Sequence, residues 1–203
     1  MDGRDITFMK EYRRAALIGR LFQDPMRGTA PDMTVEENLA LAYSRGKRKN
    51  LSFGVKKSDT AFFKSALLSF GMGLEDRLQS RVGLLSGGQR QVITLLMATI
   101  ASPKLLMLDE HTAALDPSVA RKVLDTTRDI VKDQKLTTLM ITHNIDSALK
   151  LGSRTVMMNA GRIILDISGK ERAEMTIPRL LEMYSQKGQS ALDNDRMLLS
   201  ETE

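Results

Sequence analysis

The 203-residue sequence contains no cysteine, which excludes disulfides, cysteine-ligated zinc and thiol catalysis. Tryptophan is absent and aromatic residues make up only 4% of the chain, so aliphatic side chains and methionine must build the core. Long apolar runs are also lacking. The longest, from Val92 to Ala101, has about half of the ~20 residues that a membrane-spanning helix needs.

Charge of one sign does not dominate, since the formal net charge is +5 and 27% of the residues are charged. This composition and length are typical of one soluble globular domain. The basic residues are dispersed apart from a short cluster of Arg45, Lys47, Arg48 and Lys49. Such a patch is a weak signal for nucleic-acid binding. We therefore expect no nucleic-acid partner.

Apolar strands alternate with helices from about residue 90 to residue 160, which predicts an α/β fold with a parallel sheet covered by helices. Strands 105–108 and 137–142 have the apolar character of strands buried on both faces. A further strand is expected over 15–22, and a hairpin over 155–158 and 162–167. The expected helices span residues 34–43, 59–70, 74–81, 87–101, 118–133, 146–151 and 176–184.

Polar residues stand where ligands of parallel sheets bind, directly after the strands. Asp109 and Glu110 follow the apolar run Leu105 to Leu108. One carboxylate in this place can hold Mg²⁺, and the second can orient or deprotonate a water that attacks a phosphate. Two acids in an ordinary strand-to-helix loop would look the same, so the pattern alone leaves both interpretations open.

Three further segments have the same ambiguity when each is taken alone. In Leu85-Ser86-Gly87-Gly88-Gln89, two glycines allow close backbone approach, and the start of a helix directs its free N–H groups at an anion. His143 follows a strand and could hydrogen-bond a phosphate. Gln23 follows the strand that ends at Phe22 and could reach a phosphate or a metal-bound water. The competing interpretations are that the glycine segment is only a turn, that the histidine is structural and that the glutamine is an ordinary polar loop residue.

The order of these segments resembles the ATP-binding subunits of ABC transporters. Phe22-Gln23-Asp24-Pro25 resembles the Q-loop, Leu85 to Gln89 matches the signature sequence, and Leu105 to Asp109 resembles Walker B. Glu110 stands where the family has its catalytic glutamate, Ala114-Leu115-Asp116 resembles the D-loop, and His143 the switch histidine. Five motifs in order cover residues 5 to about 168.

The resemblance implies a role for each matched residue, with ATP and Mg²⁺ as the bound groups. Asp109 would hold Mg²⁺ together with Gln23, which would also report the nucleotide state. Glu110 and His143 would be catalytic. The residues expected to contact nucleotide are Gln23, Ser86, Gly87, Gly88, Gln89 and Asp116, those of the signature acting on ATP held by the opposite subunit of a head-to-tail dimer.

The resemblance also implies partners and a location. We expect a second ATP-binding subunit, a transmembrane permease subunit that docks near Gln23, and a substrate-binding protein, with the chain at the cytoplasmic face of the cell membrane. His111 follows Glu110 where most members have proline. The stretch Leu108 to Asp116 is similar to that of amino-acid (tryptophan/tyrosine-type) uptake ATPases.

One family motif is missing. No Gly-x-x-x-x-Gly-Lys-Ser/Thr segment occurs, although this P-loop would cradle the phosphates. We therefore expect a P-loop NTPase-like cassette that lacks its N-terminal P-loop portion. Residues 1–185 would form a partial ATP-binding domain with a helical subdomain at about 33–100, and residues 186–203 a polar tail.

Two alternatives to a transporter ATPase stay open. One is a non-catalytic partner that lends its LSGGQ sequence to the ATP site of another subunit. The intact Asp109, Glu110 and His143 argue against it. The other is a soluble ABC-type ATPase, for which the long insertions or second cassette of such proteins are not visible.

Overall fold

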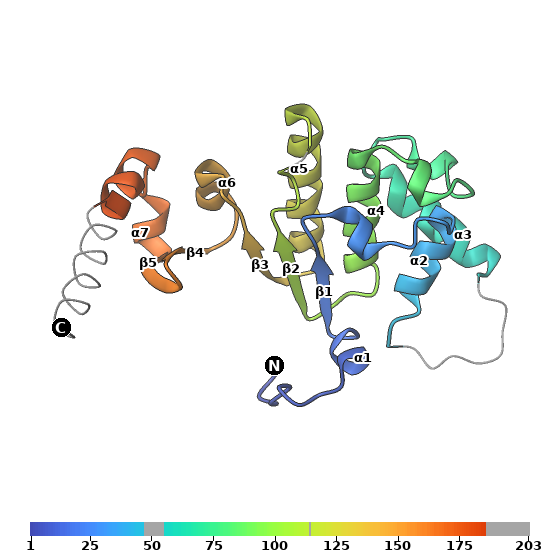
Figure 1. Cartoon of the computed structure of the whole chain (residues 1–203), viewed down its shortest axis with the longest axis horizontal. Coiled ribbons are helices and arrows are strands. Elements are labelled where there is room, and N and C mark those ends of the chain that lie inside the picture. Colours follow the sequence, from blue (N-terminus) through green and yellow to red (C-terminus); the bar gives the residue numbers. More distant parts are fainter. Residues whose placement is uncertain (47–54, 114, 186–203) are drawn as a thin grey trace, which may run out of the picture. The chain divides into compact units, whose positions relative to one another are not determined.

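The computed structural model describes residues 1–46, 55–113 and 115–185. They form two compact units, of which the first ends at Ile141 and the second begins at Thr142 (Figure 1). Each unit has its own apolar core. Several predicted features lie outside the described residues: Lys47, Arg48 and Lys49 of the basic cluster, Ala114 of the D-loop, and the tail over residues 186–203.

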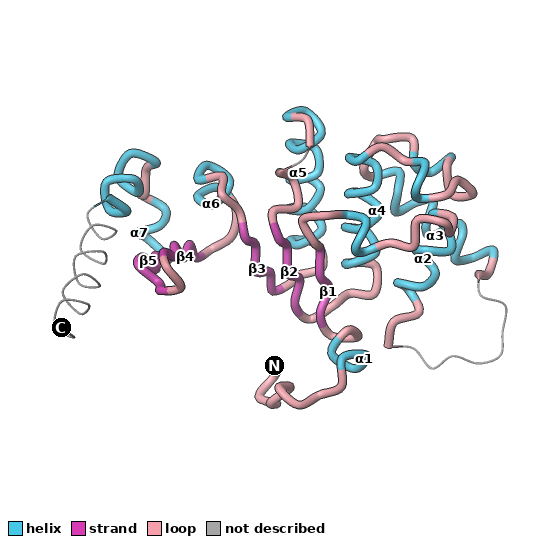
Figure 2. The backbone as a smooth tube through the Cα atoms, viewed as in Figure 1, coloured by secondary structure: helices cyan, strands magenta, loops and turns pink. Residues whose placement is uncertain are grey.

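The first unit contains a parallel sheet of three strands in the order β1-β2-β3, which are β1 (Ile18–Leu21), β2 (Leu105–Asp109) and β3 (Thr137–Ile141). The register places Leu21 beside Leu108 and Leu108 beside Met140. Because the strands run in one direction, the loops that follow β1 and β2 leave from the same end of the sheet (Figure 2). The predicted α/β class is confirmed.

Only one face of this sheet is deeply buried. Leu106 is 0% exposed and Leu108 2%, whereas Leu139 and Ile141 are 53% and 52% exposed on the other face. The prediction that both strands are buried on both faces is therefore wrong for β3 and only half correct for β2. The main core, which includes residues of α4 and Val123 of α5, lies on the face that carries Leu106 and Leu108.

Helix α4 (Gly87–Thr99) packs against β1 in the main core, to which α5 (Pro117–Asp133) contributes Val123. The contact with β1 requires Gly19, because a Cβ atom there would lie 2.3 Å from the carbonyl oxygen of Ala98. A side chain at this position would thus separate the helix from the strand.

Helices α2 (Val35–Tyr43) and α3 (Lys57–Leu68) are grouped with α4 (Figure 1). The predicted capping box at the start of α2 is confirmed: Thr34 Oγ1 accepts from the Glu37 N–H (3.2 Å), and the Glu37 carboxylate accepts from the Thr34 N–H (2.7 Å). The same pair lowers the pKa of Glu37, mainly through the Thr34 backbone N–H.

The helix predicted over residues 74–81 is wrong. This segment contains the 3-10 turn η2 (Leu74–Asp76) and a turn that the Ser80 N–H closes on the Arg77 carbonyl (2.9 Å), and the 3-10 turn η3 (Val82–Leu84) follows it. Its backbone also bonds to the chain at the start of α2, because the Val35 N–H donates to the Ser80 carbonyl (3.0 Å), and the Val82 N–H that follows donates to the Met33 carbonyl (3.0 Å). The remaining elements of this unit are α1 (Glu11–Arg14) and the 3-10 turn η1 (Pro25–Gly28).

The second unit contains an antiparallel hairpin between short helices. Its elements are α6 (Ile145–Lys150), β4 (Arg154–Asn159), β5 (Arg162–Ser168), α7 (Gly169–Ala173) and a helix over residues 177–185. Leu165, Ile167 and Leu180 are buried in its core. The predicted hairpin and the predicted last helix are confirmed. No helix in the described part of the chain is long and apolar enough to cross a membrane.

Candidate functional site

The loops after β1 and β2 bring an amide and a carboxylate together. Gln23 follows β1 and Glu110 follows β2, and Gln23 Nε2 donates a hydrogen bond to Glu110 Oε2 (3.3 Å). Asp109, the last residue of β2, is half-buried and directly precedes Glu110 in the sequence. The parallel register pairs Leu21 with Leu108, so β1 and β2 end at nearly the same height in the sheet. The residues that follow the two strands can therefore contact each other.

The backbone of Glu110 has a conformation that is uncommon for a residue with a side chain. Its φ angle is 43°, in the left-handed region. The Glu110 N–H donates to the carbonyl oxygen of Ile141 at the end of β3 (3.0 Å), and its own carbonyl accepts from the Ala113 N–H (3.0 Å). Such strain costs on the order of 1–3 kcal/mol and persists where neighbouring structure holds it, as these two bonds do here.

His111 is buried next to this carboxylate, with only 3% of its surface exposed. Burial lowers its pKa to about 4, so the imidazole is neutral at pH 7. Thr127 Oγ1 donates its single proton to the Val123 carbonyl (2.7 Å) and lies 3.4 Å from His111 Nε2. The hydroxyl can therefore only accept from the ring, which assigns the proton to Nε2. His111 anchors the turn after β2 to α5.

The signature segment begins helix α4. Ser86 Oγ accepts from the Gln89 N–H (3.3 Å), and Gln89 Oε1 accepts from the Ser86 N–H (3.3 Å), forming a second capping box. Sequence reasoning did not identify it, although the Ser-x-x-Gln spacing is its signal. Ser86 and Gln89 thus have a structural task in addition to the nucleotide contacts predicted for them.

The two glycines of this segment have different surroundings. A Cβ atom added to Gly87 would meet nothing within 4 Å, so the N-terminus of α4 is open there. One added to Gly88 would lie 2.8 Å from Val119 Cγ1 and 3.9 Å from Leu115 Cδ2. Gly88 therefore lets the signature helix approach the D-loop region and the start of α5.

A small cavity of about 40 Å³ joins these segments. Gln23, Gly87, Glu110, His111 and Gln91 are among the residues that line it. The structure thus brings the Q-loop, the signature helix and the residues after β2 to one place.

Two predicted site residues remain, Asp116 and His143. Asp116 is exposed and is the N-cap residue of α5, but its side chain makes no capping hydrogen bond. His143 belongs to the second unit, where Asn144 caps α6 through a bond from the Ser147 N–H (2.8 Å). The roles predicted for both residues remain predictions.

Sequence reasoning missed two residues that support the site. Asn38 is fully buried and clamps the chain after η1: Oδ1 accepts from the Ala30 N–H (2.8 Å), and Nδ2 donates to the Ala30 and Thr34 carbonyls (3.0 and 2.9 Å). Arg90 donates to the Leu85 carbonyl (2.9 Å) and so fixes the signature turn. Their hydrogen bonds to backbone carbonyls, which no sequence motif indicates, distinguish them from other polar helix residues.

Comparison with known proteins decides the family. Residues 1–113 match the sequence profile described as ABC transporter. A tyrosine transport ATP-binding protein of Clostridioides difficile is 43% identical over 184 residues, which cover 91% of this chain and 73% of that protein. The chain belongs to the ABC transporter family. It is one of the ABC ATPases, whose members bind ATP.

Other members of the ABC transporter family are similar over part of their length. A methionine import ATP-binding protein of Rhizobium etli is 36% identical over 167 residues, which cover 81% of this chain and 44% of that protein. The fold matches an ATP-binding cassette in its ADP conformation, with a TM-score of 0.64 and 25% identity over 86% of this chain and 71% of that one. A dimeric ATP-binding cassette bound to ADP and Pi gives a TM-score of 0.70 at 22% identity, over 83% of this chain and 71% of that one. This second likeness shows the shared fold alone.

Proposed function

We propose that this chain acts in the ATP-hydrolysing subunit of a membrane transporter that takes up an amino acid. The hydrogen bond between Gln23 and Glu110 carries the chemical part of the proposal, because it joins the Q-loop to the expected water-activating carboxylate. The identity of 43% to a tyrosine transport protein supports the substrate class, with tyrosine or a similar amino acid as the solute.

Glu110 would act as the general base that orients and deprotonates the attacking water. Gln23 donates to one of its oxygens and so directs the carboxylate. Ser86 and Gly87 lie at the open end of α4, where free N–H groups favour an anion such as a terminal phosphate. This phosphate would belong to ATP held by the opposite subunit of a head-to-tail dimer, and Gly88, Gln89 and Asp116 would contact nucleotide as well. His143 would contact the terminal phosphate of the ATP on which Glu110 of the same chain acts.

The donor set fits Mg²⁺ bound together with a nucleotide. No group of three or more histidine or acidic side chains that could hold a metal occurs among the described residues. Mg²⁺ in nucleotide sites keeps several waters and takes one or two protein oxygens besides the phosphates. Asp109 and the amide oxygen of Gln23 would supply these oxygens, and the ion would neutralise charge on the phosphates.

As partners we propose a second ATP-binding subunit, a transmembrane permease subunit and a substrate-binding protein, at the cytoplasmic face of the membrane. The names of the relatives, which include tyrosine transport and methionine import proteins, support an importer.

The test compares wild type with Glu110→Gln, using phosphate release and uptake of radiolabelled tyrosine by the assembled transporter. Loss of a general base lowers rates by about 10²–10⁴-fold. The control is Asp129→Asn, the same change of acid to amide on the exposed surface of α5. Equal turnover in wild type and Glu110→Gln would refute the assignment of the base.

A second function, the lending of the signature to another subunit's ATP, is favoured by the open end of α4. A Cβ atom added to Gly87 would meet nothing within 4 Å. The chain would be mixed with a P-loop cassette whose own signature serine has been replaced. Restored turnover that survives Glu110→Gln but is lost with Ser86→Ala would establish lending instead of catalysis by this chain.

A further inference from the structure

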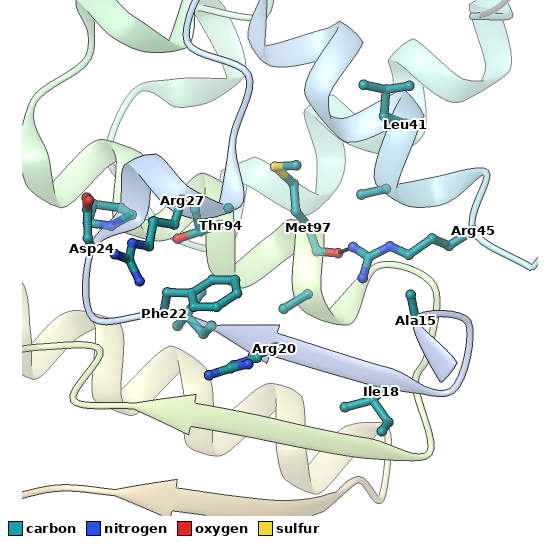
Figure 3. A pocket seen from close by; sticks show the side chains of 15 residues that line it. Ala15, Ile18, Arg20, Phe22, Asp24, Arg27, Leu41, Arg45, Thr94 and Met97 are labelled. Carbon is teal, nitrogen blue, oxygen red and sulfur yellow. Dashed lines mark hydrogen bonds between the residues drawn. The ribbon is translucent and has the colours of Figure 1, made fainter. Parts of the chain in front are cut away.

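Two hollows border the loop that carries Gln23. The larger has a volume of about 370 Å³, and Phe22 and Asp24 are among the residues that line it (Figure 3). Its Arg45 donates to the Met97 carbonyl oxygen. The smaller is the cavity of about 40 Å³ that Gln23 itself lines. Among the described residues of the two linings, one buried side-chain nitrogen has no hydrogen-bond partner, and it belongs to the smaller cavity.

This nitrogen is Nε2 of Gln91, a residue of α4 that lies one helical turn after Gly87. Only 2% of the surface of Gln91 is exposed, and its Nε2 donates to no protein group in the part of the chain that the structure describes. Most buried polar side-chain atoms bond to a protein group or to an ordered water, because an unpaired one keeps its full desolvation cost. An ordered water is therefore the expected partner of this amide.

The cavity has the room and the polar groups for one small ligand. A buried water needs ~10–15 Å³ of cavity volume and two to four polar partners. The cavity offers about 40 Å³, and Gln23, Gln91 and Glu110 line it. Its occupant must accept a hydrogen bond from the Gln91 amide, which excludes a metal ion, and the Glu110 carboxylate disfavours an anion. Water meets both conditions, since it accepts from an amide and donates to a carboxylate.

We infer that Gln91 holds a buried water that hydrogen-bonds the pair formed by Gln23 and Glu110, and that Gln91 is thereby a positioning residue for the base. The positioning role rests on the proposed function, which makes Glu110 the base, whereas the water site does not. This water is distinct from the one that Glu110 would activate. It binds beneath the signature helix without nucleotide, and the reaction does not consume it.

The water connects the signature helix to the base within one chain. Gln23 Nε2 donates to Glu110 Oε2 (3.3 Å), and an ionised carboxylate has about four lone-pair positions, so it can accept from the water as well. Gln91 and Gly87 lie on the same helix. A bond from the water therefore limits the directions that the carboxylate can take, and it ties these directions to the position of α4.

The test compares wild type with Gln91→Met, which keeps the length of the side chain and removes its hydrogen-bonding groups. The control is Gln134→Met, the same change at the exposed C-cap of α5. Crystal structures of the nucleotide-free chain, at a resolution that shows ordered water, test the site directly, and the wild-type structure does so even where a variant fails to fold. Thermal melts by circular dichroism and the ATP turnover of the assembled transporter complete the comparison.

We expect a water ~2.7–3.2 Å from Gln91 Nε2 in wild type and in the control, and none in Gln91→Met. The lost bonds should lower the Tm of Gln91→Met by ~1–6 °C and its kcat by about 2–10-fold, with KM for ATP unchanged, while Gln134→Met behaves as wild type.

A dry cavity in wild type overturns the water site. So does a higher Tm for Gln91→Met, because removal of a truly unpaired buried amide stabilises the fold. Wild-type kcat in Gln91→Met, with the water lost, overturns the positioning role. The diffraction and the melts need no ATP, so their outcome is separate from the test of Glu110 as the base.

Discussion

Substitution of the two signature glycines by alanine separates their packing role from their predicted role at the nucleotide. Gly88→Ala places a methyl group 2.8 Å from Val119 Cγ1, whereas Gly87→Ala places one in open space. Overpacking costs ~1–3 kcal/mol, and replacing glycine by alanine in a helix returns ~0.5–1 kcal/mol. We therefore expect Gly88→Ala to lower the free energy of unfolding by about 0.5–2 kcal/mol and Gly87→Ala to leave it unchanged or raise it slightly.

Urea unfolding followed by far-ultraviolet circular dichroism measures these differences, since the chain has no tryptophan to report by fluorescence. Val119→Ala completes a double-mutant cycle. It should destabilise the Gly88→Ala form less than it destabilises wild type, because it removes the methyl group that causes the collision. Equal effects of Val119→Ala in both backgrounds, or a Gly88→Ala form as stable as Gly87→Ala, would refute the packing argument.

Three further substitutions test individual contacts. Burial lowers the pKa of His111 to about 4, against 6.5 for a free histidine, so the folded state resists its protonation. The free energy of unfolding should therefore be highest above about pH 6.5 and fall by up to ~3 kcal/mol as pH falls from there through 4. Urea titrations at a series of pH values should show a smaller fall for His111→Gln. Asn38→Ala should lower the free energy of unfolding by ~2–4 kcal/mol because it removes the Asn38 bonds to the Ala30 N–H and to the Ala30 and Thr34 carbonyls, and a change below ~0.5 kcal/mol would contradict this. Arg172→Met should remove donors from the Leu149 and Leu151 carbonyls (2.8 and 2.6 Å) and speed amide exchange in α6, whereas unchanged exchange would assign Arg172 no clamping role.

Local signals in the sequence predict most elements of the fold. The Thr34 and Glu37 spacing predicts the start of α2, and the Asn159-Ala160-Gly161 turn predicts the hairpin, because both depend on contacts within a few residues. The failures involve contacts over longer distances. The segment 74–81 forms turns instead of a helix, and its Leu78 and Ser80 carbonyls accept from the N–H groups of Glu36 and Val35. One face of β3 is exposed because burial depends on which elements pack against a strand.

In the candidate site, too, the sequence predicts local features but not those that depend on distant contacts. Gln23, Asp109 and Glu110 each follow a predicted strand, where ligands of parallel sheets bind, and in the structure Gln23 and Glu110 contact each other. The left-handed backbone of Glu110, the burial of His111 and the clamp formed by Asn38 could not be predicted in this way. Each of them depends on tertiary neighbours that no short motif encodes.

The hydrogen bond between Gln23 and Glu110 couples the positions of the two loops that carry them, and this coupling free energy acts equally in both directions. Any event that moves Gln23 away removes from the Glu110 carboxylate a bond worth ~1.5–3 kcal/mol for a charged acceptor. Any ligand that takes over this carboxylate oxygen must in turn release Gln23 by the same free energy. This contact by itself couples the two loops by a factor of about 10–150 in either direction.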